Sequence, residues 1–171
     1  MPAPEPADPD RLTSRPAQRR VASAYVAAQA VLMVLLVVPL PGGRVWVLPA
    51  WAVVVCIVVG VVGLGVMVVG GSVLGRGLTA SPMPNDRAEL RTGGMYRYVR
   101  HPMYSGTLLA GAALVVWSGS LVRLGVLVAL GALFTVKARW EEQRLAQTFD
   151  GYADYARRTP RFVPRARVGQ R

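Results

Sequence analysis

Four apolar runs divide the chain and limit what it can fold into. The first two are long enough for a helix to cross a hydrocarbon core of about 30 Å, which needs about 20 residues. The last two are shorter and are joined only at Gly119 and Ser120, which predicts a helical hairpin. The runs cover residues 21–40, 46–71, 104–119 and 121–136. We therefore expect an all-α membrane bundle of about four transmembrane helices; in a three-crossing alternative the hairpin is a buried re-entrant element.

Composition supports the membrane interpretation. A content of 53% hydrophobic and 17% charged residues is too apolar for an ordinary soluble domain of 171 residues. Structural zinc sites usually take four Cys or His ligands, and the chain has one of each, Cys56 and His101. No metal site is therefore expected, and we interpret Cys56 as a packing residue within the second run.

The net charge of +11 raises the question of nucleic-acid binding, and the placement of the basic residues answers it. Eighteen of the twenty basic residues lie before the first run, between the second and third runs, or after the fourth. Only Arg44 and Arg123 lie in the other two turns. Basic residues accumulate in cytoplasmic loops, so both termini are predicted to be cytoplasmic. Anionic membrane lipids are the expected partners of this charge, and no nucleic acid is expected.

The chain is expected to have three regions. Residues 1–20 are rich in proline and charge and lack an apolar pattern, which predicts a disordered cytoplasmic tail. Residues 21–71 hold the first two transmembrane helices. Residues 72–171 hold most of the polar motifs, the helical hairpin and a cytoplasmic C-terminal segment with its own helical part.

The stretch RYVRHPMYSG, residues 97–106, places the only histidine directly before the third apolar run. The residue before a proline avoids the helical conformation, and proline suits the first helical position. We therefore expect His101 to cap a helix that begins at Pro102. The start of such a helix suits a carboxylate or phosphate, and Arg97 and Arg100 would strengthen this site. Alternatively, the arginines and tyrosines only anchor the helix among lipid headgroups.

A second group of polar residues is KARWEEQRLAQTF, residues 137–149, where the helix of the fourth run is expected to continue into the cytoplasm. The adjacent Glu141 and Glu142 point about 100° apart on a helix, so we expect one to face inward while the other pairs with a basic neighbour. The hairpin returns both to the level of His101. Carboxylates that face an anion-binding helix start suit a zwitterion, although a charged helix beyond a span can also be simply solvated.

Glycines recur in GVVGLGVMVVGG, residues 60–71. Small residues let helices pack closely in lipid, which is enough to account for them. In a second interpretation, Gly63 and Gly65 open room for a bound ligand beside the helix.

Together, GGMYRYVRHPMYSG, EEQRLAQTF and YADYARRTPRFVP resemble the isoprenylcysteine carboxyl methyltransferase family and its phospholipid methyltransferase relatives. The resemblance covers roughly residues 60–164 and implies S-adenosylmethionine as cofactor, a zwitterion with ribose hydroxyls and a sulfonium. It implies that Arg100, His101 and Tyr104 hold the carboxylate end and that the paired glutamates hold the ammonium or the ribose. The cofactor-binding residues implied in this way are Arg100, His101, Tyr104, Glu141, Glu142, Gly63 and Gly65.

The resemblance also implies an acceptor that is lipophilic or prenylated. Arg139 or Arg97, with Arg161 as a further candidate, would position an anionic acceptor for catalysis. An isoprenylcysteine-type carboxylate is the first candidate, and a lipid amine or a small hydrophobic thiol is the alternative. Two other classes of function stay open. Sterol reductases resemble this family in part, which leaves an NADPH-dependent membrane reductase, and the bundle could also be a non-catalytic lipid-binding protein.

Overall fold

The computed structural model of the chain describes residues 9–74 and 90–165, with side chains described over 20–72 and 90–165. All regular structure in these ranges is helical, as expected. In chain order the elements are α1 (Pro9–Val37), α2 (Ala50–Leu74), the short 3-10 helix η2 (Gly94–Arg97), α3 (Pro102–Ser118), α4 (Leu121–Thr148) and α5 (Tyr152–Arg158).

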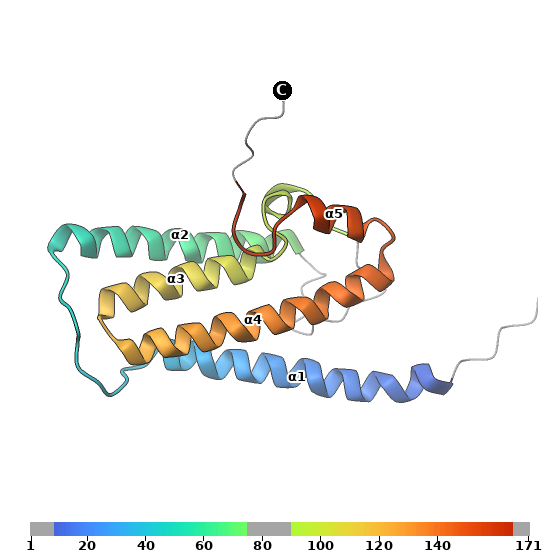
Figure 1. The fold of residues 1–171 in the computed structure, drawn as a ribbon, viewed down its shortest axis with the longest axis horizontal. Coiled ribbons are helices and arrows are strands. Elements are labelled where there is room, and N and C mark those ends of the chain that lie inside the picture. Colours follow the sequence, from blue (N-terminus) through green and yellow to red (C-terminus); the bar gives the residue numbers. More distant parts are fainter. Residues whose placement is uncertain (1–8, 75–89, 166–171) are drawn as a thin grey trace, which may run out of the picture.

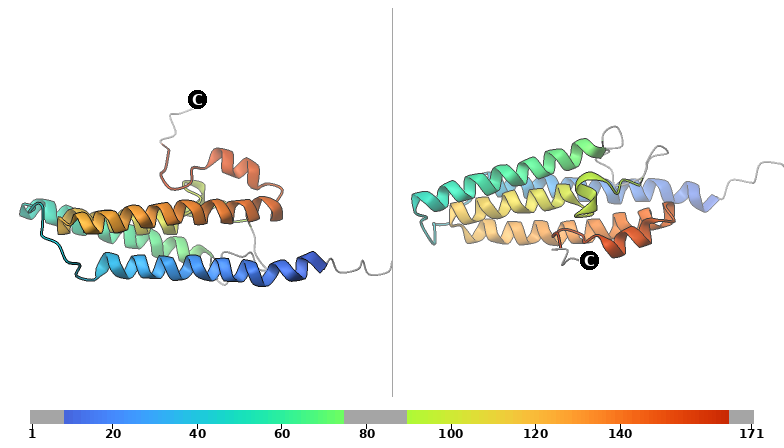
Figure 2. Two further views of the ribbon diagram at one scale, coloured as in Figure 1. Left: turned by 60° about the horizontal axis from the view of Figure 1, so that its bottom comes forward. Right: turned by 90° about the horizontal axis from the view of Figure 1, so that it is seen from above.

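The four long helices lie side by side as an antiparallel bundle (Figure 1). Helix α3 packs between α2 and α4, and α1 packs on α4, an order that the two further views also show (Figure 2). One end of the bundle collects the start of α1, the end of α2, the start of α3 and the end of α4. Helices η2 and α5 lie at the same end, so the motifs at both ends of the hairpin come together there.

Three of these helices are long and apolar enough to cross a membrane: α1 over Arg20–Val37, α2 over Ala50–Ser72 and α4 over Leu121–Thr148. Only 6% of the α2 stretch is buried inside the protein, so its many exposed valines need an apolar surrounding. Helix α3 has 17 residues, or about 25 Å at 1.5 Å per residue, and runs back along α2. The expected membrane bundle is confirmed, with three long spans and a shorter fourth helix beside them.

The turn between α3 and α4 shows why the predicted hairpin closes tightly. Gly119 has a φ of 63°, and a Cβ there would lie 2.6 Å from the carbonyl oxygen of Trp46. Ser120 then caps α4, since its side-chain oxygen accepts a hydrogen bond from the backbone N–H of Arg123 at 3.3 Å. A two-residue connection therefore suffices to reverse the chain.

Arg123 also joins the hairpin to α1. Its guanidinium donates to the carbonyl oxygens of Leu36 and Val38, each at 3.1 Å. These carbonyls lie at the end of α1, where backbone acceptors have no partner within the helix. Of Arg44 and Arg123, the two basic residues in the turns at this end, Arg123 thus stabilises the contact between α1 and α4.

Gly63 and Gly106 bring α2 and α3 into backbone contact. A Cβ on Gly63 would lie 2.6 Å from the amide nitrogen of Ala110, and a Cβ on Gly106 would lie 2.5 Å from the carbonyl oxygen of Gly63. At Gly65, by contrast, a Cβ would meet nothing within 4 Å. Close helix packing therefore explains Gly63 but not Gly65.

The beginning of α1 corrects one expectation. The tail predicted to be disordered over residues 1–20 is helical from Pro9 onward, while residues 1–8 lie outside the described part. Extending an existing helix fixes fewer bonds than starting one, so the long apolar helix that follows can carry extra polar turns. At the same end of the bundle, the predicted helical continuation beyond the fourth run is confirmed, because α4 ends at Thr148.

Candidate functional site

The start of α3 is held from outside the helix by a segment close to the C-terminus. His101 is the N-cap of α3, with Pro102 at the first helical position, as the sequence predicts. The backbone N–H groups of Arg100 and His101 donate to the carbonyls of Pro160 and Arg161 at 2.9 and 3.1 Å. These bonds tie residues 160–162, which we call the strap, across the start of α3.

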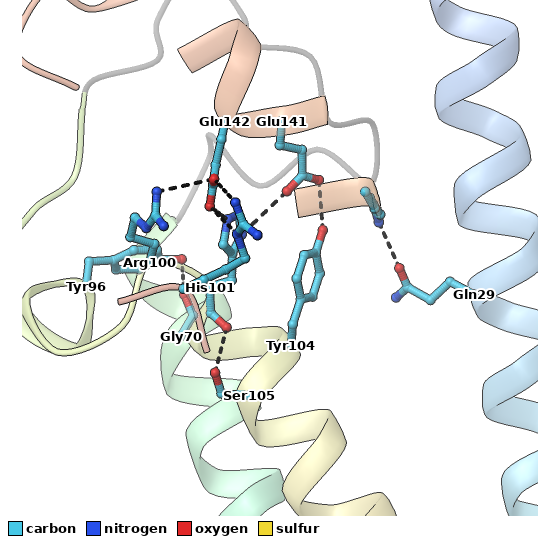
Figure 3. Close-up of polar contacts among 11 residues, drawn as sticks. Gln29, Gly70, Tyr96, Arg100, His101, Tyr104, Ser105, Glu141 and Glu142 are labelled. Atoms are coloured by element: carbon cyan, nitrogen blue, oxygen red, sulfur yellow. Dashed lines mark hydrogen bonds and ion pairs between the residues drawn. The ribbon is translucent and has the colours of Figure 1, made fainter. Parts of the chain in front are cut away.

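Ser105 adds a further bond between the strap and α3. Its hydroxyl lies 2.6 Å from the carbonyl oxygen of Phe162. Figure 3 shows its second bond, to the carbonyl oxygen of His101 at 3.1 Å. The backbone N–H of Ser105 also donates to the His101 carbonyl, at 3.1 Å. The N–H groups at this helix start are therefore not all free for an anion.

Glu142 lies at the centre of the polar cluster between α3, α4 and the strap. It accepts two hydrogen bonds from the Arg161 guanidinium, from Nε at 2.9 Å and from Nη2 at 2.6 Å. Arg100 Nη1 lies 3.2 Å from Glu142, and His101 Nε2 lies 3.0 Å away. The side chain of Glu142 is only 10% exposed. Three basic side chains therefore use its acceptor capacity.

Glu141 faces the same histidine from the other side. Tyr104 donates its phenolic hydrogen to Glu141 at 2.8 Å, and His101 Nδ1 lies 3.6 Å from the carboxylate (Figure 3). The expectation that only one glutamate faces inward is thus wrong. The two side chains diverge from the helix and then converge on the two nitrogens of one ring. Glu141 keeps acceptor positions for a ligand, which Glu142 lacks.

Aromatic stacking fixes the ring of His101. It lies parallel to the Tyr104 ring with centroids 5.2 Å apart, and Tyr104 stacks in turn on Phe134, with centroids 4.4 Å apart. Phe134 is fully buried and belongs to the apolar core with Leu36, Val115 and Leu130. The polar cluster therefore rests directly on the packed core.

Arg161 was a candidate for positioning the acceptor, but in the structure its guanidinium binds Glu142. Its hydrogen bonds to Glu142 raise the pKa of the guanidinium further above its usual range. An arginine held by two such bonds in a partly buried place is a positioning group for the carboxylate. It is not free to bind an acceptor in this arrangement.

Tyr96 is a contact residue that sequence reasoning missed. Its hydroxyl donates to the Gly70 carbonyl near the end of α2 at 3.1 Å, and its own carbonyl accepts from Tyr155 of α5 at 2.6 Å. Burial, with a smaller contribution from Glu141, raises the pKa of Tyr96 to about 12, so its hydroxyl stays a donor at neutral pH. It links α2, η2 and α5 around the cluster.

Four of the predicted residues lie apart from the cluster. Arg97 is exposed and donates to the Tyr98 hydroxyl at 3.0 Å, and Arg139 is exposed on α4. Gly63 lies in the α2–α3 contact and Gly65 beside open space. The structure therefore brings together five of the nine predicted site residues: Arg100, His101, Tyr104, Glu141 and Glu142.

Lys137 is the second residue that sequence reasoning did not single out. It is the only lysine of the chain, it is 5% exposed, and its ammonium lies 5.3 Å from the centre of the Tyr104 ring. Its Nζ donates to Oε1 of Gln29 on α1 at 2.8 Å. The available signal was its spacing of four residues from Glu141, which places both on one face of α4.

The donor set of the cluster suits a zwitterionic ligand. Arg100 and His101 supply cationic or donor groups, and Glu141 supplies a carboxylate with free acceptor positions. Within the described ranges, no three His, Cys, Asp or Glu side chains gather in a way that could hold a metal ion.

Comparison with known proteins identifies the family of the chain. Residues 51–151 match the family described as phospholipid methyltransferase, and this range includes every member of the cluster except Arg161. A cobalt-zinc-cadmium resistance protein, CzcN of Cupriavidus metallidurans, is 40% identical over 77 residues, which are 44% of this chain and 36% of the relative. A nickel-cobalt-cadmium resistance protein, NccN of Alcaligenes xylosoxydans xylosoxydans, is 35% identical over 78 residues, 45% of this chain and 37% of the relative.

The aligned parts are thus little more than a third of these two curated relatives. The family match is broader and covers more than half of the present chain. The chain belongs to the phospholipid methyltransferase family.

Proposed function

We propose that the protein transfers a methyl group from S-adenosylmethionine to a lipophilic acceptor within the membrane. The observation that carries the proposal is the cluster of His101, Tyr104, Glu141 and Glu142 at one end of an apolar bundle. Its residues lie inside the range that matches a methyltransferase family. A charged cluster on an apolar bundle gives a polar cofactor and an apolar acceptor one shared site.

The cofactor would supply a methyl group on a positively charged sulfur. Arg100 would hold its carboxylate, because its Nε keeps a donor without a partner among the described residues, and His101 would lie beside it with its ring nitrogens facing the two glutamates. Glu141 would hold the ammonium group or the ribose hydroxyls, because in the described part of the chain it accepts only the hydrogen bond from Tyr104. Glu142 would hold Arg100 and His101 in place. Gly65, beside open space, would border the cofactor only if the ligand extends along α2.

An isoprenylcysteine-type carboxylate is the acceptor we favour. Methyl transfer to a carboxylate needs no general base, so the chain has only to hold the two reactants close together and in line. The acceptor's apolar tail would reach the site sideways between the helices, which accounts for an enzyme embedded in lipid. A lipid amine is the second candidate, favoured by the phospholipid methyltransferase match. It would need to lose a proton, for which His101 or Glu141 is within the cluster.

The test uses purified protein in lipid vesicles with methyl-labelled cofactor and two acceptors, an N-acetyl-S-prenylcysteine and phosphatidylethanolamine. A methyl ester releases labelled methanol in alkali, whereas an N-methyl group stays bound. We expect base-labile label on the prenylcysteine. Base-stable label on the phospholipid would select the second candidate.

A binding measurement separates the proposal from the other classes. S-adenosylhomocysteine should raise the melting temperature of the protein, and NADPH should not. The reverse result would point to a reductase. If neither ligand stabilises the protein and no label is transferred, the result would favour a non-catalytic lipid-binding protein.

A further inference from the structure

Lys137 is a buried basic side chain that the proposed cofactor site does not use. It lies four residues before Glu141 on α4, on the side of the cluster that faces the apolar part of the bundle. Its partner Gln29 lies near the middle of the apolar stretch Arg20–Val37. The ammonium therefore lies beside the apolar stretch of α1, one helical turn before Glu141.

The hydrogen bond and the ring contact of Lys137 are with neutral groups, and the carboxylate of Glu141 is the negative charge that acts on it without forming an ion pair. Its Nζ donates to the amide oxygen of Gln29 at 2.8 Å and lies over the Tyr104 ring at 5.3 Å. None of the ion pairs formed among the described side chains includes it. An ammonium has three donors, so two remain after the bond to Gln29. A buried charge is costly unless it is paired, and ionisable residues at membrane depth usually mark a functional site.

Other basic residues are poorly placed to receive an anion that arrives from the bilayer. Arg100 and Arg161 are paired with Glu142, and Arg97 and Arg139 are exposed. Lys137 is buried against Tyr104, whose hydroxyl bonds to Glu141. It is thus the basic group between the proposed cofactor residues and the apolar helices.

We propose that Lys137 binds the carboxylate of the methyl acceptor and so selects an anionic acceptor over an amine. This inference rests on the proposed function. The amide oxygen of Gln29 occupies the place that one carboxylate oxygen would take or share. The other carboxylate oxygen would form the new bond to the methyl carbon. The bond from sulfur to that carbon breaks, its electron pair stays on sulfur, and no proton is transferred.

The experiment compares two ligands that differ only in charge, an N-acetyl-S-prenylcysteine and its carboxamide. Both compete with a labelled prenylcysteine at equal mole fraction in vesicles, in the presence of S-adenosylhomocysteine. The unaltered protein should bind the carboxylate at least tenfold more tightly. In Lys137→Met, affinity for the carboxylate should fall roughly ten- to a hundred-fold, the loss expected for one charge-assisted hydrogen bond. Affinities for the carboxamide and for S-adenosylhomocysteine should stay unchanged.

Gln29→Leu is the matched control, because it breaks the same contact between α1 and α4 but keeps the ammonium. It should retain the preference for the carboxylate. Equal losses for both ligands in Lys137→Met and Gln29→Leu would mean that Lys137 only joins two helices, and would overturn the inference. Should Lys137→Met not fold, equal binding of the two ligands by the unaltered protein overturns it just as well. Failure of the unaltered protein to bind S-adenosylhomocysteine would instead reject the proposed function itself.

Discussion

The two adjacent glutamates differ in what surrounds them. Glu142 accepts hydrogen bonds or ion pairs from Arg100, His101 and Arg161, whereas Glu141 receives one strong bond, from Tyr104. A buried carboxylate that pairs with several cations supports their positions, and removing it leaves them without a partner. A carboxylate with acceptor positions to spare can bind a ligand. The pair is therefore expected to divide the work, one residue for the fold and one for the cofactor.

This division predicts that the same substitution, Glu to Gln, weakens ligand binding at Glu141 and lowers protein stability at Glu142. Glu141→Gln should weaken the binding of S-adenosylhomocysteine about ten- to a hundred-fold, since one charged hydrogen bond contributes about 1.5 to 3 kcal/mol. Its melting temperature should change little. Glu142→Gln should destabilise the protein by about 3 kcal/mol, because it leaves two arginines partly buried without their counter-ion. Titration calorimetry and thermal melting in one detergent measure both effects. Equal melting temperatures for the two variants would contradict the assignment.

Sequence reasoning could find the centre of this cluster but not its supports. His101 before a proline and the glutamates at the end of a returning helix must meet if the hairpin forms, so their proximity was predictable. The role of Arg161 was not, because it depends on the strap folding back over α3 through backbone bonds. Lys137 was missed for a similar reason. Only the folded bundle shows that Lys137 is buried and that its hydrogen-bond partner is the neutral amide of Gln29 on another helix.

Among the elements, α2 and α3 make the closest contact, and it depends on two glycines. Backbone atoms of Ala110 and Gly106 occupy the space that a side chain on Gly63 would need. Backbone cannot move aside as a flexible side chain can, so the helices would have to separate. Gly65 lies two residues away on the same helix and borders open space. The same motif thus holds one glycine that the packing requires and one that it does not.

Alanine at each glycine tests this difference. Gly63→Ala should lower the stability by about 1–3 kcal/mol, the usual cost of adding atoms to a packed contact. Gly65→Ala should leave stability unchanged or slightly higher, because alanine favours the helix. Thermal melting of the empty protein gives both values. If Gly65→Ala instead reduces affinity for S-adenosylhomocysteine without lowering stability, the glycine borders the cofactor, as the family resemblance implies.

The four apolar runs predicted the long helices better than their ends. The hairpin turn at Gly119 and Ser120 was expected from two adjacent residues and is confirmed by their backbone geometry. The early start of α1 at Pro9 was not expected, because proline and charge normally argue against a helix. Helices η2 and α5 are too short to carry a pattern of their own. Contacts such as the bond from Tyr155 to Tyr96 hold them in place instead.

At the scale of the whole molecule, most basic residues belong to chain segments at one end of the bundle. The start of α1, the end of α2, the start of α3 and the end of α4 share one end of the bundle (Figure 1). Eighteen of the twenty basic residues belong to the chain segments that begin or end there. Arg44 and Arg123 belong to the opposite turns, and Arg123 is used to hold the end of α1. The residues of the polar cluster lie at this basic end of the bundle.

This arrangement predicts that both termini and the loop between α2 and α3 face the cytoplasm. Basic segments are retained on that side during insertion, and four passes of the chain return the C-terminus to it. Reporter fusions after Arg171 and near Arg87 should both give a cytoplasmic signal, and a fusion near Gly43 should give the opposite one. If α3 were re-entrant, the chain would cross only three times. The fusion after Arg171 would then report the far side while that near Arg87 stayed cytoplasmic. The glutamates at the end of α4 could not then share a cytoplasmic site with His101, so this outcome would reject the membrane orientation and the proposed route of the cofactor together.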